Sequence, residues 1–393
     1  MKKIVMTLFG ALLLAGCQNE LYTESQKENG SGQGAYIAAE GPIQIFVEEG
    51  KEYFIKDVKV GLTVKEDKAF DVPLIVGDQA QLDEYNKKNN TSYLMLPPEM
   101  YEMPTVMNFK PNLAMQSIPV SLKNLKFSLK GDYALPIRLS NGSASPIPGE
   151  EEALLILEKR TRTKVLLMNG SGSESDKMFP QDFKVKQWTM EAMVKRSAYN
   201  ANNRSIGGTK LVANAGPHDE IYTRFGDVTI DPNQLQIKTG SAQIDVPKNK
   251  FAAKPNEWYM LTFVYDGKIT YVYVNGDLVA SSEIRDGEYG LIGFWIGGAN
   301  EYIREVRFWD IARTQQQIKA FTWKMVNPDE KGLSLYYPCN GLKRNHETGE
   351  ITEDDTMIWN WATYYDGDKD NLNLPMKGRF DDNGGKMFVF PAE

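Results

Sequence analysis

Short runs of alternating apolar and polar residues, separated by turn-forming residues, cover most of the chain from residue 36 onward. A period of two places every second side chain on the same face of a β-strand. The clearest runs are residues 43–47, 58–64, 70–76, 117–122, 133–139, 153–157, 188–194, 258–265, 269–274, 291–297 and 302–309. The pattern therefore predicts an all-β fold.

Two dipeptides mark tight turns between expected strands. Asp266-Gly267 and Asn275-Gly276 each separate apolar runs, and such pairs favour the two-residue turns of β-hairpins. We therefore expect residues 258–279 to form consecutive antiparallel strands.

Only two short helices are expected among these strands. Asp78 is a good N-cap, and Gln81 lies at the capping-box position three residues later. Thr314 and Gln317 form a second capping box, which predicts a helix that ends near Met325.

Composition limits the classes of function. The chain has 393 residues, of which 41% are hydrophobic, and a net charge of −7 with no basic stripe. Nucleic acid is therefore an unlikely partner. Besides Cys17 the sequence has one cysteine, Cys339, which we expect to be a small buried apolar residue.

Three motifs of the second half occur together in one order. They are residues 188–192, the hairpin 258–279 and the stretch 302–318, which begins Tyr-Ile-Arg-Glu-Val-Arg-Phe-Trp-Asp. This region resembles the laminin-G/concanavalin A-like jelly roll of bacterial surface proteins. The resemblance covers residues 160–393 and implies a β-sandwich of two large sheets.

The first half is similar to another family. Residues 83–86 (Asp-Glu-Tyr-Asn), 91–93 (Thr-Ser-Tyr) and 133–138 (Tyr-Ala-Leu-Pro-Ile-Arg) resemble an Ig-like domain of unknown function, the DUF1735 type, of many Bacteroidetes lipoproteins. The resemblance covers residues 36–159 and implies an Ig-like β-sandwich. It also implies a glycan-related role at the cell surface and leaves catalysis open.

The first 35 residues are expected to serve export and anchoring. Two lysines and a short apolar run, residues 4–14, precede Leu-Ala-Gly and Cys17, which resembles a bacterial lipobox. The resemblance implies that residues 1–17 are a signal peptide and that Cys17 becomes a lipidated N-terminus at the outer membrane, facing the cell exterior. An ordinary signal peptide with a chance cysteine is the alternative. Polar, glycine-rich residues 18–35 are expected to form a flexible tether.

Catalytic signatures are absent from the sequence. It contains no G-x-S-x-G, P-loop or H-E-x-x-H motif, and no strand has the E-x-D-x-x-E or E-x-D-x-E spacing of concanavalin-like glucanases. The acidic residues of 347–355 are expected to form a solvated loop. We therefore expect no enzyme activity, with a glycoside hydrolase of unrecognised carboxylates as the alternative.

Aromatic clusters are the candidate glycan-binding residues, because sugar rings stack on aromatic faces. The candidates are Trp359, Asn360, Trp361, Tyr364 and Tyr365, together with Tyr271 and Tyr273 on a second strand. If this segment were a strand, alternation would place Trp359 and Trp361 on the same face of it. The alternative to a ligand-binding face is that this face packs into the core. Val272 and Val274 would face the core, so the two tyrosines would lie on the opposite surface.

A candidate metal site follows the aromatic cluster. Asp366, Asp368 and Asp370 supply oxygen ligands at alternate positions, as calcium loops do, although the bidentate glutamate of an EF-hand is missing. Calcium is the one cofactor that the sequence suggests.

The leading prediction is a non-catalytic, lipid-anchored surface protein that binds oligosaccharide or polysaccharide. It would be an accessory of a polysaccharide-utilisation system, next to a glycan transporter or hydrolase, and would meet the membrane through its lipid alone. A protein-binding adhesion module is a further alternative, since laminin-G folds also bind proteins.

Overall fold

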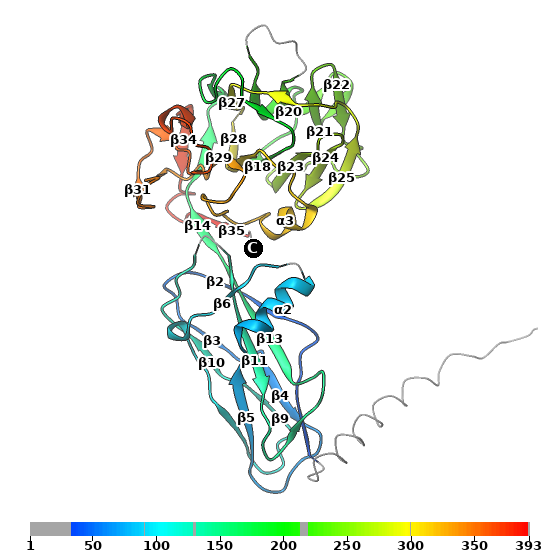
Figure 1. The fold of residues 1–393 in the computed structure, drawn as a ribbon, viewed down its shortest axis with the longest axis vertical. Coiled ribbons are helices and arrows are strands. Elements are labelled where there is room, and N and C mark those ends of the chain that lie inside the picture. Colours follow the sequence, from blue (N-terminus) through cyan, green and yellow to red (C-terminus); the bar gives the residue numbers. More distant parts are fainter. Residues whose placement is uncertain (1–32, 90, 129–130, 213–218, 299, 392–393) are drawn as a thin grey trace, which may run out of the picture. The chain divides into compact units, whose positions relative to one another are not determined.

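The computed structural model describes residues 33–89, 91–128, 131–212, 219–298 and 300–391 (Figure 1). The chain divides into two compact units between Arg160 and Thr161. The sequence analysis placed this boundary between residues 159 and 160. Cys17 and the predicted signal peptide lie outside the described residues.

The first unit is almost entirely β-structure. Its strands are β1 (Gly34–Ile37), β2 (Ile43–Val47), β3 (Tyr53–Ile55), β4 (Lys59–Leu62), β5 (Phe70–Val76), β6 (Leu94–Met95), β7 (Tyr101–Glu102), β8 (Val106–Phe109), β9 (Met115–Ser117), β10 (Val120–Leu122), β11 (Tyr133–Leu139), β12 (Ser145–Pro146) and β13 (Glu152–Lys159). They form sheets in the orders β12-β1-β4-β9, β3-β10-β7 and β2-β13-β11-β5-β8, with β6 beside β11. One cluster of buried residues, including Val60, Val120 and Leu135, joins the three sheets into a sandwich.

The predicted tether, residues 18–35, is three residues too long at its C-terminal end. Ala35 is fully buried in β1, which pairs with β4. The amide of Gly34 donates to Thr63 Oγ1 at 3.0 Å, and Gln33 Nε2 donates to the carbonyl of Val64 at 2.9 Å. These contacts fix the chain to the sandwich from residue 33 onward.

Proline explains why the predicted strand 117–122 is two strands. β9 ends at Ser117 and pairs with β4, whereas β10 begins at Val120 and pairs with β3. Pro119 lacks the amide hydrogen that a continuous ladder would need. The chain therefore changes sheets at this proline.

The first predicted helix is present as α2 (Gln79–Asn89). Asp78 Oδ1 accepts a hydrogen bond of 2.9 Å from the amide of Gln81, as expected for an N-cap. Leu82 is the buried residue of this helix and packs with Ala134 and Ile156. A short 3-10 helix, η1 (Pro98–Met100), follows β6.

The second unit is a larger β-sandwich. Its strands are β14 (Thr161–Thr163), β15 (Val165–Met168), β16 (Ser173–Ser175), β17 (Lys184–Val185), β18 (Trp188–Arg196), β19 (Arg204–Lys210), β20 (Ile221–Asp227), β21 (Ile230–Thr239), β22 (Ala242–Asp245), β23 (Trp258–Tyr265), β24 (Thr270–Val274), β25 (Asp277–Ser282), β26 (Tyr289–Gly290), β27 (Gly293–Ile296), β28 (Glu301–Trp309), β29 (Leu333–Tyr337), β30 (Leu342–Arg344), β31 (Ile351–Glu353), β32 (Met357–Ile358), β33 (Leu374–Pro375), β34 (Gly378–Asp381) and β35 (Phe388–Phe390). Its helices are α3 (Gln315–Ala320) and the 3-10 helix η3 (Asp370–Leu372).

Two sheets make up the body of this unit. The eight-stranded sheet has the order β25-β24-β23-β18-β28-β15-β34, with β29 beside β28, and the six-stranded sheet has the order β16-β27-β19-β20-β21-β22. Their inner faces share one core cluster, to which Trp188, Phe263 and Phe308 contribute from the first sheet and Phe225 and Phe294 from the second. The all-β prediction is confirmed.

Helix α3 is shorter than predicted. The capping box of Thr314 and Gln317 is present, but the helix ends at Ala320 and not near Met325. The carbonyl oxygens of Phe321 and Lys324 accept hydrogen bonds from the buried guanidinium of Arg307. A helix continued to Met325 would use the carbonyl of Phe321 in its own ladder, so the contact of that carbonyl with Arg307 competes with helix extension.

Two further properties complete the fold. Among the described residues, no helix has the length and apolar character needed to cross a membrane. Cys339 is buried and forms no disulfide with a described residue, and burial raises the pKa of its thiol. The expectation of a small buried residue at this position is confirmed.

Candidate functional site

One row of residues crosses the outer face of the six-stranded sheet. The strand register places in this row Glu174, Trp295, Gly208, Tyr222, Lys238 and Gln243, one from each strand. Their neighbours Phe294, Ile221 and Ile237 are buried in the core between the sheets. Because side chains alternate along a strand, the row points away from that core.

A glycine lets the indole ring of Trp295 lie against the sheet. A Cβ atom on Gly208 would lie 2.6 Å from Cζ2 of Trp295 and 2.1 Å from the carbonyl oxygen of Ile221. Trp295 Nε1 donates to the carbonyl oxygen of Thr209 at 3.2 Å, which fixes the plane of the ring. The ring of Tyr222 lies beside it, with centroids 5.1 Å apart and planes inclined by 47°. Both rings are half-buried, so they form a fixed but accessible aromatic surface.

A second row, two residues along the strands, is polar. Ser205, Arg224, Gln236 and Asp245 are cross-strand neighbours in this row. Arg224 Nε donates to Gln236 Oε1 at 2.6 Å, and Gln236 Nε2 donates to Asp245 Oδ1 at 2.6 Å. Asp227 forms an ion pair with Arg224. The polar groups therefore hold one another in place before any ligand arrives.

The phenol of Tyr222 links the two rows. Its hydroxyl lies 2.8 Å from Ser205 Oγ and donates to Asn203 Oδ1 at 3.2 Å. Asn203 Oδ1 also accepts from Arg224 Nη1 at 2.8 Å. The guanidinium carbon of Arg224 lies 5.5 Å from the centroid of the Tyr222 ring. We call these two rows, with Asn203 and Asp227, the Trp295 face.

The carboxylate of Asp227 is held in its ionised form by its neighbours. A hydrogen bond from the amide of Val228, helped by Gln236 and Arg224, lowers the pKa of Asp227. An ionised carboxylate only accepts hydrogen bonds, and each of its oxygens can accept more than one. The Trp295 face thus offers a flat aromatic surface bordered by hydrogen-bond acceptors, which suits a ligand with apolar C–H faces and many hydroxyl groups.

The predicted contacts of Trp361 and Asn360 are corrected by the structure. Trp361 is 1% exposed, and its Nε1 donates to the carbonyl oxygen of Leu342 at 3.1 Å. Asn360 is also 1% exposed, and its Oδ1 accepts from the amide of Tyr336 at 2.9 Å. Neither side chain has a surface on which a sugar could bind.

The other members of that cluster do not form one platform. Trp359 is half-buried, and Lys343 Nζ lies 4.1 Å from the centroid of its indole. Tyr365 packs its ring against Phe179, with centroids 5.0 Å apart in an edge-on arrangement. Tyr364 is 40% exposed. Trp359 and Tyr364 stay accessible, while Tyr365 serves packing.

The predicted tyrosine pair is partly covered. Val272 and Val274 lie in the core, as expected. Tyr273, however, is 7% exposed because it packs against Ile318 of α3. Tyr271 stays half-buried, and its hydroxyl donates to Asp266 Oδ2 at 3.1 Å. The sequence analysis did not foresee that α3 covers this surface.

The predicted calcium loop does not gather its ligands. Asp368 Oδ1 accepts from the amide of Asp370 at 3.0 Å, and Asp368 Oδ2 accepts from Asn371 Nδ2 at 2.9 Å, so this carboxylate is engaged by residues of η3. Lys369 Nζ donates to the carbonyls of Thr363 and Tyr365, which brings a cation into the loop. The described residues contain no group of three or more His, Cys, Asp or Glu side chains placed to hold a metal ion. Calcium binding by Asp366, Asp368 and Asp370 therefore has no support from the geometry.

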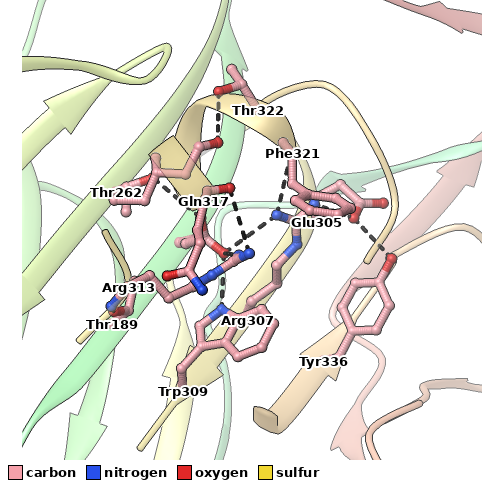
Figure 2. Close-up of polar contacts among 12 residues, drawn as sticks. Thr189, Thr262, Glu305, Arg307, Trp309, Arg313, Gln317, Phe321, Thr322 and Tyr336 are labelled. Carbon is pink, nitrogen blue, oxygen red and sulfur yellow. Dashed lines mark hydrogen bonds and ion pairs between the residues drawn. The ribbon is translucent and has the colours of Figure 1, made fainter. Parts of the chain in front are cut away.

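Buried charges lie on the outer face of the eight-stranded sheet, beneath α3 (Figure 2). Glu191 Oε2 accepts from Trp309 Nε1 at 2.9 Å and lies 3.3 Å from both Arg307 Nη1 and Arg313 Nη1. Glu305 Oε2 accepts from Arg307 Nη2 at 2.7 Å and from the hydroxyl of Tyr336 at 2.9 Å.

This network, which we call the Glu191 network, does not have the properties of a glycosidase carboxylate pair. Glu191 and Glu305 are at most 1% exposed. Burial acts to raise the pKa of Glu191, but the guanidinium groups of Arg307 and Arg313 outweigh it and lower that pKa. A general acid needs a raised pKa and access to the substrate, and Glu191 has neither. The network instead attaches α3 and the segment after it to the sheet.

Comparison with known families defines the class of the second unit. Residues 171–319 match the family model of the concanavalin A-like lectin/glucanases superfamily. The second unit therefore contains a domain of this superfamily, and the laminin-G resemblance is confirmed. Residues 18–146 match a second family model, which is described as an N-terminal domain.

One solved structure shares the fold, and others match with lower TM-scores. A candidate carbohydrate-binding protein from Bacteroides ovatus is 24% identical, with a TM-score of 0.55 and a match that covers 87% of this chain and 95% of that chain. A multidomain protein including DUF1735 from the same organism is 11% identical over 70% of this chain and 95% of that chain, with a TM-score of 0.29. EndoBT-3987 of Bacteroides thetaiotamicron, solved with its Man5GlcNAc product, is 18% identical over 32% of this chain and 30% of that chain, with a TM-score of 0.26. No curated protein matches the chain.

The sequence analysis missed the Trp295 face. Residues 291–297 were recognised as a strand, but nothing in that run shows which strand lies beside it. A signal was present in the Gly207-Gly208 pair, because glycine inside a strand often marks the close approach of another group. Only the pairing of β19 with β27 identifies that group as Trp295.

Proposed function

We propose that the second unit binds a glycan on the Trp295 face and does not cleave it. The observation that carries this proposal is the fixed Trp295–Tyr222 surface beside a pre-arranged row of carboxylate and amide groups. Pre-arranged groups lose little conformational entropy on binding, so a shallow face can still bind usefully.

The surroundings of the carboxylate groups in the second unit support binding without catalysis. The carboxylates of Glu191 and Glu305 are enclosed and paired with arginines. On the Trp295 face, the carboxylates of Asp227 and Asp245 are held by guanidinium or amide donors. Such acceptors suit hydroxyl recognition better than proton donation to a leaving group.

The cellular setting is part of the same proposal. Cys17, after a short apolar run and Leu-Ala-Gly, would carry a lipid that anchors the chain at the outer membrane, facing the exterior. The protein would present glycan to a neighbouring transporter or hydrolase of a polysaccharide-utilisation system. A candidate carbohydrate-binding protein with the same fold supports the glycan part of this proposal.

A binding screen tests the proposal. Purified residues 33–393 are run by affinity electrophoresis through gels that contain single polysaccharides, once with calcium and once with a chelator. We expect retardation by one class of polysaccharide, equal in the two conditions, and no release of reducing ends. Uniform mobility in all gels would contradict glycan binding, and release of reducing ends would contradict the non-catalytic role.

A further inference from the structure

The charges of the Trp295 face are balanced. Its cations are Arg224 and Lys238, joined by Lys210 from outside the two rows through its ion pair with Glu174, and its anions are Glu174, Asp227 and Asp245. Lys210 forms an ion pair with Glu174, and Arg224 forms one with Asp227. The face therefore presents no excess positive charge to a ligand.

Each nitrogen of the Arg224 guanidinium already donates a hydrogen bond within the face. Its Nε donates to Gln236, its Nη1 to Asn203 and its Nη2 to Asp227. Arginine recognises carboxylate and sulfate groups best through two parallel hydrogen bonds. Three of the five N–H groups of Arg224 are thus committed to the polar row, and its charge is paired with Asp227.

Lys238 is the remaining cation. Among the residues that the structure describes, no ion pair is formed by its ammonium group, but its charge helps to lower the pKa of Asp227. An anionic sugar on this surface would meet the carboxylates of Asp227 and Asp245, and like charges at such short range repel one another.

We propose that the glycan bound by the Trp295 face is neutral, a polymer of hexoses or pentoses without uronate or sulfate groups. Hydroxyl groups can donate to Asp227 and Asp245, and uncharged C–H faces can stack on Trp295. This inference rests on the proposed function, because it assumes that the face binds glycan.

Matched polymers test the inference. Binding of a protein comprising residues 33–393 is measured by isothermal titration at low salt against neutral glucans, mannans, galactans, arabinans and xylans. The same is done for polygalacturonate and alginate, before and after chemical reduction of their carboxylates. We expect binding to at least one neutral polymer, and at least about tenfold weaker binding of each uronate polymer than of its reduced form.

Two substitutions separate the effect of the face from that of overall charge. Asp245→Asn removes one carboxylate from the face, and we expect it to raise the affinity for unreduced uronate polymers several-fold. Asp231→Asn is the control, because it removes an exposed carboxylate paired with Lys248 outside the two rows, and it should leave this affinity unchanged.

The outcomes distinguish the claim that the glycan is neutral from the claim that the Trp295 face binds glycan. Binding of a uronate or sulfated polymer as tight as that of any neutral polymer, lost in Trp295→Ala, would overturn the neutral class but keep the proposed site. Absence of binding to all polymers would overturn the proposed function and this inference with it.

Discussion

Glu191 shows how a buried charge can serve structure alone. Its carboxylate joins β18 to Trp309 of β28 and to Arg313, which precedes the N-cap of α3. Removing one partner of a buried ion pair leaves the others uncompensated. We therefore expect Glu191→Gln to lower the free energy of unfolding by about 3 to 5 kcal/mol, measured by urea denaturation. Glu283→Gln, which breaks an exposed pair with Lys268, should change it by less than about 1 kcal/mol. Equal effects of the two substitutions would contradict this role.

The same carboxylate predicts a response to acid. The pKa of Glu191 is lowered from its ordinary value of 4.5, so its contribution to stability is complete above that value and is lost as the pH falls through the lower, folded-state pKa. The free energy of unfolding should therefore fall more steeply below pH 4.5 in the native protein than in Glu191→Gln. Parallel curves between pH 7 and pH 3 would show that this carboxylate does not titrate as described.

The exposure of single tryptophan side chains could not be predicted from the sequence. Trp359 and Trp361 are the densest pair in the sequence, yet Trp361 is enclosed and only Trp359 stays accessible. Residues 359–363 adopt no regular strand, so alternation could not assign their faces. Trp295 received no functional role because its surroundings come from strands that are distant in sequence.

At the scale of elements, strands with clean alternation were predicted well. The predicted strands 70–76, 133–139 and 258–265 coincide with β5, β11 and β23. The predicted end of α3 was wrong because Arg307, from a different element, donates hydrogen bonds to backbone carbonyls in the segment that a longer helix would occupy. Local sequence patterns thus predicted the bounds of these strands and the start of α3, whereas tertiary contacts decided where α3 ends.

The close packing of Trp295 against Gly208 of β19 can be tested by substitution. Gly208→Ala would place a methyl group against the indole of Trp295 and against the carbonyl oxygen of Ile221, so both the ring and the β19–β20 backbone contact must shift. We expect glycan affinity to fall about tenfold or more, together with a lower melting temperature. Gly172→Ala is the control, because its Cβ would lie no closer than 3.2 Å to any atom, and it should keep the affinity. Native affinity in Gly208→Ala would show that the position of Trp295 does not matter for binding.

At the scale of the molecule, each unit has its own core. The buried cluster of the second unit draws on both of its large sheets, and that of the first unit joins its three sheets. Domains with separate cores generally fold alone. We expect a fragment of residues 161–393 to unfold cooperatively and to bind glycan as tightly as residues 33–393. A fragment that is folded but does not bind would show that the first unit contributes to the site.

The central claim is that Trp295 and its neighbours form the glycan-binding surface, and paired tryptophan substitutions test it most directly. Trp295 and Trp359 are both half-buried, and each donates its Nε1 hydrogen to a backbone carbonyl, of Thr209 and Asp354 respectively. Titration calorimetry with the glycan found in the screen should give at least about a tenfold loss of affinity, equal to 1.4 kcal/mol, in Trp295→Ala and native affinity in Trp359→Ala. Native affinity in Trp295→Ala, with loss in Trp359→Ala, would contradict the account and place the site near the loop that carries Trp359 and Tyr364.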